Sequence, residues 1–326
     1  MAIPIWLIAT LCAAVFNSWR TAVQQSVRAK LSVNGAGLVR YFYGLPVAAA
    51  LLAGWCLVRG TALPGCTVLP LLGWALAGGL AQIVGTNLLL LAFSYHNYVA
   101  GTAYSKTEAI QGAILSFILL HERLSWISWV GIAIGVAGVL YLAGGGKRLH
   151  ARDVVQPAAL CGLGAGFGYT MTSIFVKLAT REVHTSDKIL AALFVLVVVQ
   201  AGQVLMQGAY VLLRERGEMT RVLQSWRTSS LVGLLASLGS AGWFTGFALA
   251  PVALVRTVGQ VEVFFTLGFG HLYLREAVKR HEVAALRAGG PARRAGAPAR
   301  RGLPATGAVR TTPAPVATTV RRTVMT

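Results

Sequence analysis

Two glutamates in apolar surroundings are the residues best placed to do chemistry in this chain. Glu108 and Glu262 each lie inside a long apolar stretch, and a second glutamate, Glu122 or Glu276, follows fourteen residues later at the end of that stretch. An ionised carboxylate at the middle of a bilayer costs at least about 2.5–3.5 kcal/mol on insertion scales. A residue kept there at that cost indicates a functional site, and two in one register indicate a duplicated transport unit.

The composition of the chain is that of a membrane protein. Hydrophobic residues make up 56% of the 326 residues and charged residues 12%, which leaves too little polar surface to cover a water-soluble globule. A helix needs about 20 residues to cross the roughly 30 Å of hydrocarbon in a bilayer. Windows of that order predict an all-α polytopic membrane protein. The nine predicted spans are 3–22, 35–58, 68–94, 98–120, 125–144, 157–180, 189–213, 228–250 and 251–274.

The spacing of the glutamates predicts an internal duplication. Glu262 and Glu276 lie 154 residues after Glu108 and Glu122. Because five spans per repeat is an odd number, the second repeat would enter the membrane from the opposite side. Such inverted repeats place a substrate site at mid-membrane between them. The alternative is a chance alignment of two Leu/Gly-rich helices.

The stretch from Glu108 to Leu142 resembles the end of an EamA-type repeat in the drug/metabolite transporter superfamily, whose fourth helix closes with a leucine-rich Gly-Glu-Arg-Leu motif. The residues that carry this resemblance are Leu119, Leu120, His121, Glu122, Arg123, Leu124 and Ser125, followed by Gly131, Gly135 and Gly138. Arg40, followed by Gly44, Leu45 and Pro46, is also similar to that family. The resemblance covers about residues 3–282. It implies a ten-helix secondary carrier in the bacterial cytoplasmic (inner) membrane that moves small metabolites or drugs, commonly by export.

On this resemblance the chain divides into three parts. Residues 1–146 are a first repeat of five helices, residues 147–282 a second repeat with four recognisable helices, and residues 283–326 a basic, Ala/Arg/Gly/Pro-rich disordered tail. Eight arginines without any acidic residue from position 287 onward keep this tail out of the bilayer, so the tenth helix is missing or replaced. A frameshift and a native tail that binds anionic lipid headgroups both remain open. Nucleic-acid binding is not expected, because no aromatic residue is interleaved with the arginines.

Helical geometry predicts which side chains share the cavity with the two glutamates. In the span 98–120, Tyr104 and Gln111 lie on the face of Glu108, whereas Lys106 is turned about 200° away and is expected to face elsewhere. In the last span, Gly259 and Thr266 share the face of Glu262. The predicted substrate-binding residues are Tyr104, Lys106, Glu108, Gln111, Trp243, Arg256, Gln260 and Glu262.

The glutamates have two interpretations each. Glu108 and Glu262 could accept a proton or bind a cationic group of the solute. Alternatively, Glu108 pairs with Arg256 and Glu262 with Lys106, which would only neutralise buried charge. Glu122 and Glu276 are expected at the membrane interface, where a helix-end or loop-ordering role competes with solute contact.

Other kinds of chemistry find no support in the sequence. Histidines are scattered, cysteines form no CxxC pair, and neither a nucleophile–base–acid set nor a phosphate-binding glycine loop is present. No catalytic residue, cofactor or metal site is therefore expected, and the protein is not expected to be an enzyme. Gly131, Gly135 and Gly138 form a small-residue ridge that could receive a second copy of the chain.

Orientation in the membrane stays open at this stage. Lysines and arginines in the predicted loops, with Arg20 counted among them, place the N-terminus outside by the positive-inside rule. The family resemblance implies both termini inside. The expected function is a secondary transporter that exports small metabolites or drugs, with proton coupling; the alternative is a membrane-embedded binding or scaffold protein, such as an inactive truncated carrier.

Overall fold

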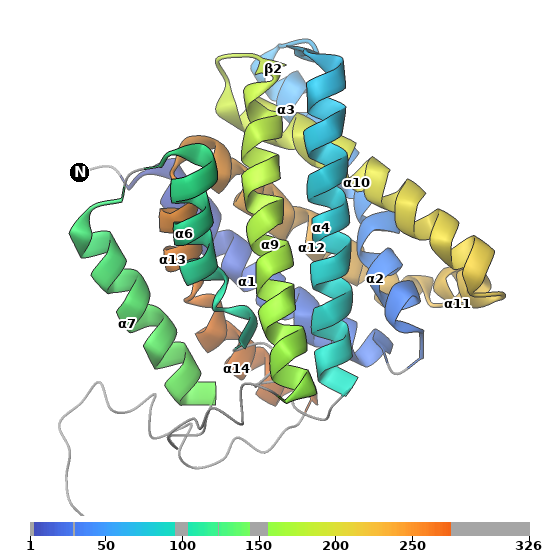
Figure 1. Ribbon diagram of the computed structural model, residues 1–326. Coiled ribbons are helices and arrows are strands. Elements are labelled where there is room, and N and C mark those ends of the chain that lie inside the picture. The colour runs from blue at the N-terminus through green and yellow to red at the C-terminus, as the bar shows by residue number, and fades with distance from the viewer. Residues whose placement is uncertain (1–2, 29, 95–103, 123, 144–155, 275–326) are drawn as a thin grey trace, which may run out of the picture. The chain divides into compact units, whose positions relative to one another are not determined.

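The computed structural model describes residues 3–28, 30–94, 104–122, 124–143 and 156–274 (Figure 1). All of them belong to one compact unit, residues 1–287, and a second unit, residues 288–326, lies outside the described ranges. The predicted tail, 283–326, and Glu276 therefore lie outside the described residues.

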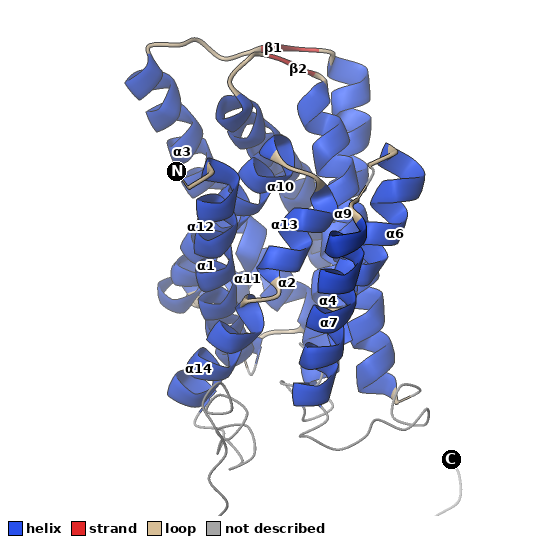
Figure 2. Ribbon diagram, turned by 90° about the vertical axis from the view of Figure 1, so that its left-hand side faces the viewer, coloured by secondary structure: helices blue, strands red, loops and turns tan. Residues whose placement is uncertain are grey.

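The described residues are almost entirely helical. The helices are α1 (Ile5–Arg28), α2 (Val33–Phe42), α3 (Gly44–Arg59), α4 (Val68–Ser94), α6 (Glu108–Leu120), α7 (Trp126–Ala143), α9 (Pro157–Arg181), α10 (Lys188–Arg214), α11 (Glu218–Gln224), α12 (Trp226–Leu249), α13 (Val252–Gly259) and α14 (Glu262–Leu274). Two short strands, β1 (Gly65–Cys66) and β2 (Val183–His184), pair antiparallel and join two loops at one end of the bundle (Figure 2). In hydrocarbon every backbone group must be satisfied within the segment, which is why these apolar runs are helices.

Length and hydropathy support the prediction of an all-α membrane protein. Five helical segments are long and apolar enough to cross a membrane, namely 33–59, 68–92, 157–181, 188–214 and 226–249; the helices 108–120 and 126–138 are apolar but shorter. Large apolar side chains lie on the outside of the bundle: Leu57, Leu69 and Ile127 are each 82% exposed. Such a surface suits contact with lipid chains and would be a liability in water.

Three predicted spans are interrupted, which corrects the reading of them as continuous helices. The span 35–58 is divided at Tyr43 between α2 and α3. Within 98–120, a turn at Lys106 and Thr107 precedes α6, and within 251–274 a turn at 260–261 separates α13 from α14. The expectation that Lys106 faces away from Glu108 is wrong for this reason, because a helical wheel does not hold across a turn.

Both glutamates open the half-helix that follows such an interruption. Glu108 is the first residue of α6 and Glu262 the first of α14, and both helices contain 13 residues. The first amides of a helix lack intrahelical acceptors and carry the positive end of its dipole, so a carboxylate is favoured there. Discontinuous helices of this kind are typical of the binding sites of secondary transporters.

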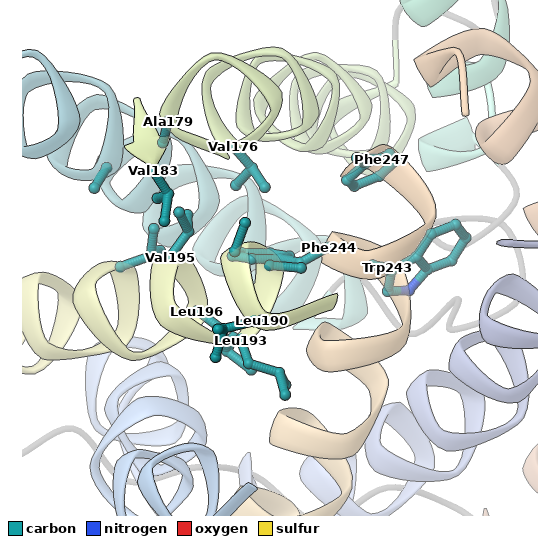
Figure 3. Packing of buried hydrophobic residues seen from close by; sticks show 14 of the residues in the cluster. Val176, Ala179, Val183, Leu190, Leu193, Val195, Leu196, Trp243, Phe244 and Phe247 are labelled. Carbon is teal, nitrogen blue, oxygen red and sulfur yellow. The ribbon is translucent and has the colours of Figure 1, made fainter. Parts of the chain in front are cut away.

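Helix packing brings the glutamates together at the centre of the bundle. α4 lies along α9 and α1 along α12, while α13 contacts both α1 and α6 (Figures 1 and 2). The α4–α9 approach depends on glycine, because a Cβ on Gly168 would lie 2.8 Å from the carbonyl oxygen of Ala81. The largest apolar core joins α9, α10 and α12, with Val176, Leu196 and Phe244 among its buried side chains (Figure 3).

Candidate functional site

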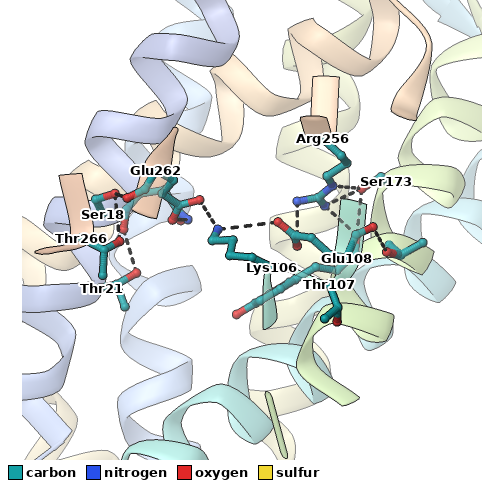
Figure 4. A network of polar contacts seen from close by, with 12 residues as sticks. Ser18, Thr21, Lys106, Thr107, Glu108, Ser173, Arg256, Glu262 and Thr266 are labelled. Atoms are coloured by element: carbon teal, nitrogen blue, oxygen red, sulfur yellow. Dashed lines mark hydrogen bonds and ion pairs between the residues drawn. The ribbon is translucent and has the colours of Figure 1, made fainter. Parts of the chain in front are cut away.

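Four charged side chains meet in the interior and form crossed ion pairs (Figure 4). Lys106 Nζ donates to Glu262 Oε2 at 2.5 Å and lies 3.6 Å from Glu108 Oε1. Arg256 Nη1 donates to Glu108 Oε2 at 3.1 Å. All four side chains are less than a tenth exposed. Of the two interpretations open from the sequence, the pairing of Glu108 with Arg256 and of Glu262 with Lys106 is the geometry that this conformation adopts.

Arg256 is held in place from two neighbouring helices. Its Nε donates to Ser173 Oγ at 2.9 Å and its Nη2 to the Tyr169 carbonyl at 2.7 Å, both on α9. The rings of Trp243 and Phe247 on α12 each have their centroid 5.1 Å from the guanidinium carbon. Cation–π contacts of this kind stabilise a desolvated cation, so Arg256 has partners besides Glu108.

Glu262 is anchored by α1, a helix in which no site residue was predicted. Asn17 Nδ2 donates to Glu262 Oε1, and Ser18 Oγ donates to the Glu262 carbonyl at 3.0 Å. Thr266 Oγ1, one turn further along α14, donates to Ser18 Oγ at 3.3 Å. The N-terminal half of α14 is thus bound to α1 through both backbone and side chain.

A small cavity of about 40 Å³ adjoins this network. It is lined by Asn17, Arg20, Thr21, Arg40, Gln82, Leu89, Ser105, Lys106, Glu108, Tyr169, Thr172, Ser240, Trp243, Phe244, Phe247, Arg256 and Glu262. At about 10–15 Å³ for each water-sized probe, that volume holds roughly three water-sized groups and no whole metabolite. In this conformation the cavity is therefore too small for a whole solute.

Five of the eight predicted substrate-binding residues line the cavity, and three do not. The five are Lys106, Glu108, Trp243, Arg256 and Glu262. Tyr104 is buried away from the lining, and Gln111 Nε2 instead donates to Thr107 Oγ1 at 3.1 Å. Gln260 lies against Gly135 of α7. The turn at 106–107 separates Tyr104 from Glu108, so the predicted common face does not include Tyr104. Gln111 stays in α6 with Glu108, but its amide donates to Thr107 and to the Leu163 carbonyl and does not line the cavity.

Arg20 and Arg40 line the cavity but were absent from the sequence-based site. Both are buried, at 2% and 4% exposed. The assignment of Arg20 to a loop is wrong, because α1 continues to Arg28. Arg40 lies inside a predicted span, so the cost criterion that selected the glutamates would also have selected this cation.

Glu122 is placed at the end of the bundle that carries β2. Its Oε1 accepts from Lys177 Nζ at 2.6 Å, and its Oε2 accepts from the backbone N–H of Val252, the first residue of α13, at 2.9 Å. Lys177 Nζ also donates to the Ala250 carbonyl at 2.8 Å. Of the two roles considered for Glu122, these contacts belong to the helix-end role.

Within the described ranges, no three His, Cys, Asp or Glu side chains lie close enough to hold a metal ion. The polar groups of the site are instead guanidinium, ammonium, carboxylate, amide and hydroxyl groups around a small cavity. Such a set can bind a small solute by hydrogen bonds and charge.

Comparisons with known proteins point to the same kind of molecule. Residues 4–144 match the EamA-like transporter family. The uncharacterized inner membrane transporter YedA of Escherichia coli K12 is 36% identical over 105 residues, which are 31% of this chain and 32% of YedA. The proteins of the same name from strains O6:H1 and O157:H7 match equally. This chain thus matches about a third of the length of these relatives.

A solved crystal structure described only as that of a protein has the same fold. It superposes with a TM-score of 0.60 over 86% of this chain and 92% of its own, at 17% sequence identity. At that identity the similarity concerns the fold alone.

Proposed function

We propose that this chain, whose residues 4–144 match the EamA-like transporter family, is an EamA-type member of the drug/metabolite transporter superfamily. On that premise it is a secondary transporter that exports small metabolites or drugs. The chain is a multi-pass integral protein of the inner membrane. The observation that carries the proposal is the crossed pairing of Lys106 with Glu262 and of Arg256 with Glu108, next to a cavity between discontinuous helices.

Two inverted repeats are part of this proposal, and the helix boundaries support them. An offset of 154 residues places α9 on α1, α10 on α2 and α3, α12 on α4, and α14 on α6. Under that mapping the α4–α9 contact and the α1–α12 contact are the same contact with the repeats exchanged. Such an exchange is what a two-fold relation between repeats produces.

The crossed pairs give a reason for proton coupling. Lys106 and Glu108 come from the first predicted repeat, and Arg256 and Glu262 from the second, so the repeats cannot separate without breaking these pairs. Separating one buried pair leaves a charge uncompensated, at about 3–5 kcal/mol. A proton bound to Glu108 or Glu262 removes the attraction and lowers that cost. Protonation and opening of the site are therefore coupled in the proposed mechanism.

Two polar contact sets, at opposite ends of the bundle, would act as gates to the small cavity. One is the contact of Glu122 with Lys177 and α13, beside the end of α9 that leads into β2. The other lies at the far end of α10, where Asn34 Nδ2 donates to Glu215 Oε1 at 2.6 Å and the Ser32 N–H donates to a carboxylate oxygen of α11 at 2.5 Å. Opening one set while the other stays closed would expose the cavity to one side at a time.

Counterflow in proteoliposomes tests this function against a membrane-embedded binding or scaffold protein. The purified chain is reconstituted with unlabelled solute inside and trace labelled solute outside, over amino acids, nucleobases, organic acids and cationic drugs. A transporter accumulates label transiently for at least one class. A solute that binds in detergent but gives no counterflow would support the scaffold alternative and overturn the proposal.

A further inference from the structure

The charges that line the central cavity do not balance. Among the described residues, four cationic side chains face it, and only two carboxylates. Lys106 and Arg256 are matched by Glu262 and Glu108, which leaves Arg20 and Arg40 in excess. In the part of the chain that the structure describes, neither arginine forms an ion pair with a carboxylate.

The hydrogen-bond partners of Arg20 are all neutral. Its Nε donates to Asn17 Oδ1 at 3.0 Å, its Nη1 to Gln24 Oε1 at 2.5 Å and its Nη2 to Thr21 Oγ1 at 2.9 Å. These bonds orient the guanidinium and do not neutralise it. A buried cation is costly in a membrane interior unless it is paired. The carboxylate that attracts Arg20, Glu262, is already paired with Lys106, so an anion from outside the chain would complete the pairing.

Arg40 is less well satisfied than Arg20. Its Nη1 donates to Thr86 Oγ1 at 3.1 Å and its Nη2 to Ser240 Oγ at 3.5 Å, and the guanidinium lies 5.5 Å from the ring centroid of Tyr41. Its Nε is buried without any hydrogen-bond partner among the described residues. A buried donor of a charged group is seldom left unused, so an acceptor from outside the chain is expected there.

The planar fork of a guanidinium matches an oxyanion, which can accept two parallel N–H bonds. Resting on the proposed function, we infer that the cavity recognises an organic anion, whose carboxylate or phosphate group is bound by Arg20 and Arg40. The cavity of about 40 Å³ is the pocket for that group. Leu89 and Phe244 supply an apolar wall for the body of the solute once the repeats separate.

The charge of the ligand can be tested with four probes that share one phenylethyl group. The full chain in detergent micelles is titrated with 3-phenylpropanoate, 2-phenylethyl phosphate, 3-phenylpropanamide and 3-phenylpropylamine, with calorimetry and the shift in thermal unfolding as readouts. We expect the carboxylate, the phosphate or both to bind and raise the midpoint, and the amide and amine to bind at least about tenfold more weakly. The two anions separate a carboxylate site from a phosphate site. Equal binding of the amide or the amine would overturn the inference.

The variants Arg40→Gln and Arg20→Gln test whether these two arginines bind the anionic group. Each is expected to weaken anion binding by about tenfold or more, because a charged hydrogen bond is lost. Removal of an uncompensated buried cation should leave the ligand-free protein as stable as the wild type or more stable. Arg227 is an exposed arginine near the start of α12, and Arg227→Gln is the matched control. It should change neither the affinity for the anion nor the stability of the ligand-free protein. If both cavity variants keep wild-type affinity, or lose stability without losing affinity, the arginines are structural and the inference fails.

These readouts are independent of transport. Anion binding without counterflow of any solute would refute the proposed function and leave the anion site intact. Counterflow of cationic or neutral solutes alone would keep the transporter and refute the anion site.

Discussion

Lys106→Met removes the ammonium that joins the two buried glutamates. Lys106 Nζ lies 2.5 Å from Glu262 and 3.6 Å from Glu108, and its side chain is 6% exposed. Glu108 keeps Arg256 at 3.1 Å in the variant, whereas Glu262 keeps the neutral Asn17 as its side-chain donor. The loss should therefore fall on Glu262. Breaking a buried pair by removing one partner destabilises by about 3–5 kcal/mol, and we expect a loss in that range.

The double variant Lys106→Met with Glu262→Gln isolates the charge effect. The side-chain amide introduced by Glu262→Gln would keep an acceptor for Asn17, and the pair of Glu108 with Arg256 remains neutral overall. We expect the second substitution to recover about 2–3 kcal/mol of the loss, which is the upper part of the range for residues in one network. Equilibrium unfolding in mixed micelles, followed by tryptophan fluorescence, measures each free energy of unfolding.

Lys188→Met is the matched control, because Lys188 is exposed at the start of α10. Its free energy of unfolding should stay close to that of the wild type. The reasoning is refuted if Lys106→Met is as stable as the control, or if the double variant is no more stable than Lys106→Met alone.

Three further outcomes follow from the structure. Glu122→Gln removes the anion that holds Lys177 and caps α13. We expect the free energy of unfolding to fall by about 1–3 kcal/mol and transport to slow, and unchanged stability and flux would contradict the helix-end role. The segment around α11 is rich in arginine and is expected inside the cell. Arg221 is exposed on α11, and Thr61 is exposed just after α3. Arg221→Cys should therefore be shielded from an impermeant maleimide in intact cells while Thr61→Cys reacts, and the reverse pattern would place the basic end outside. A Cβ at Gly131 meets no atom within 4 Å, so Gly131→Leu should lower the mass of a dimer in light scattering if this ridge joins two copies, and an unchanged mass would exclude it.

The sequence predicted the elements of the fold because apolar length decides which segments enter a membrane. It failed at the interruptions, since no proline and no cluster of turn residues marks the break at Lys106 and Thr107. A continuous helix through this position gives the wrong direction for Lys106 and a false common face for Tyr104 and Glu108.

The sequence predicted some of the residues that line the site and missed others. The cost of burying charge selected Glu108 and Glu262, and it applies equally to Arg40 within its span. Arg20 escaped because the apolar window ended near it, and charges at window ends were assigned to loops. Which partners each charged side chain finds depends on how α1, α6, α9 and α13 pack against one another. The residue spacing within a single helix does not give that packing.

The pH dependence of flux in Glu108→Gln tests the central claim most directly. Arg256 keeps its bonds to Ser173 and Tyr169, so the variant should insert and fold. Glu182, at the C-terminal cap of α9 and outside the cavity lining, supplies the control variant Glu182→Gln. Flux of a transported solute is compared among proteoliposomes with wild type, Glu108→Gln and this control over a series of imposed pH gradients. We predict that the flux through wild type and control changes with the imposed pH gradient and that the flux through Glu108→Gln does not. Glu108→Gln with the wild-type flux and pH dependence would contradict the proposed coupling.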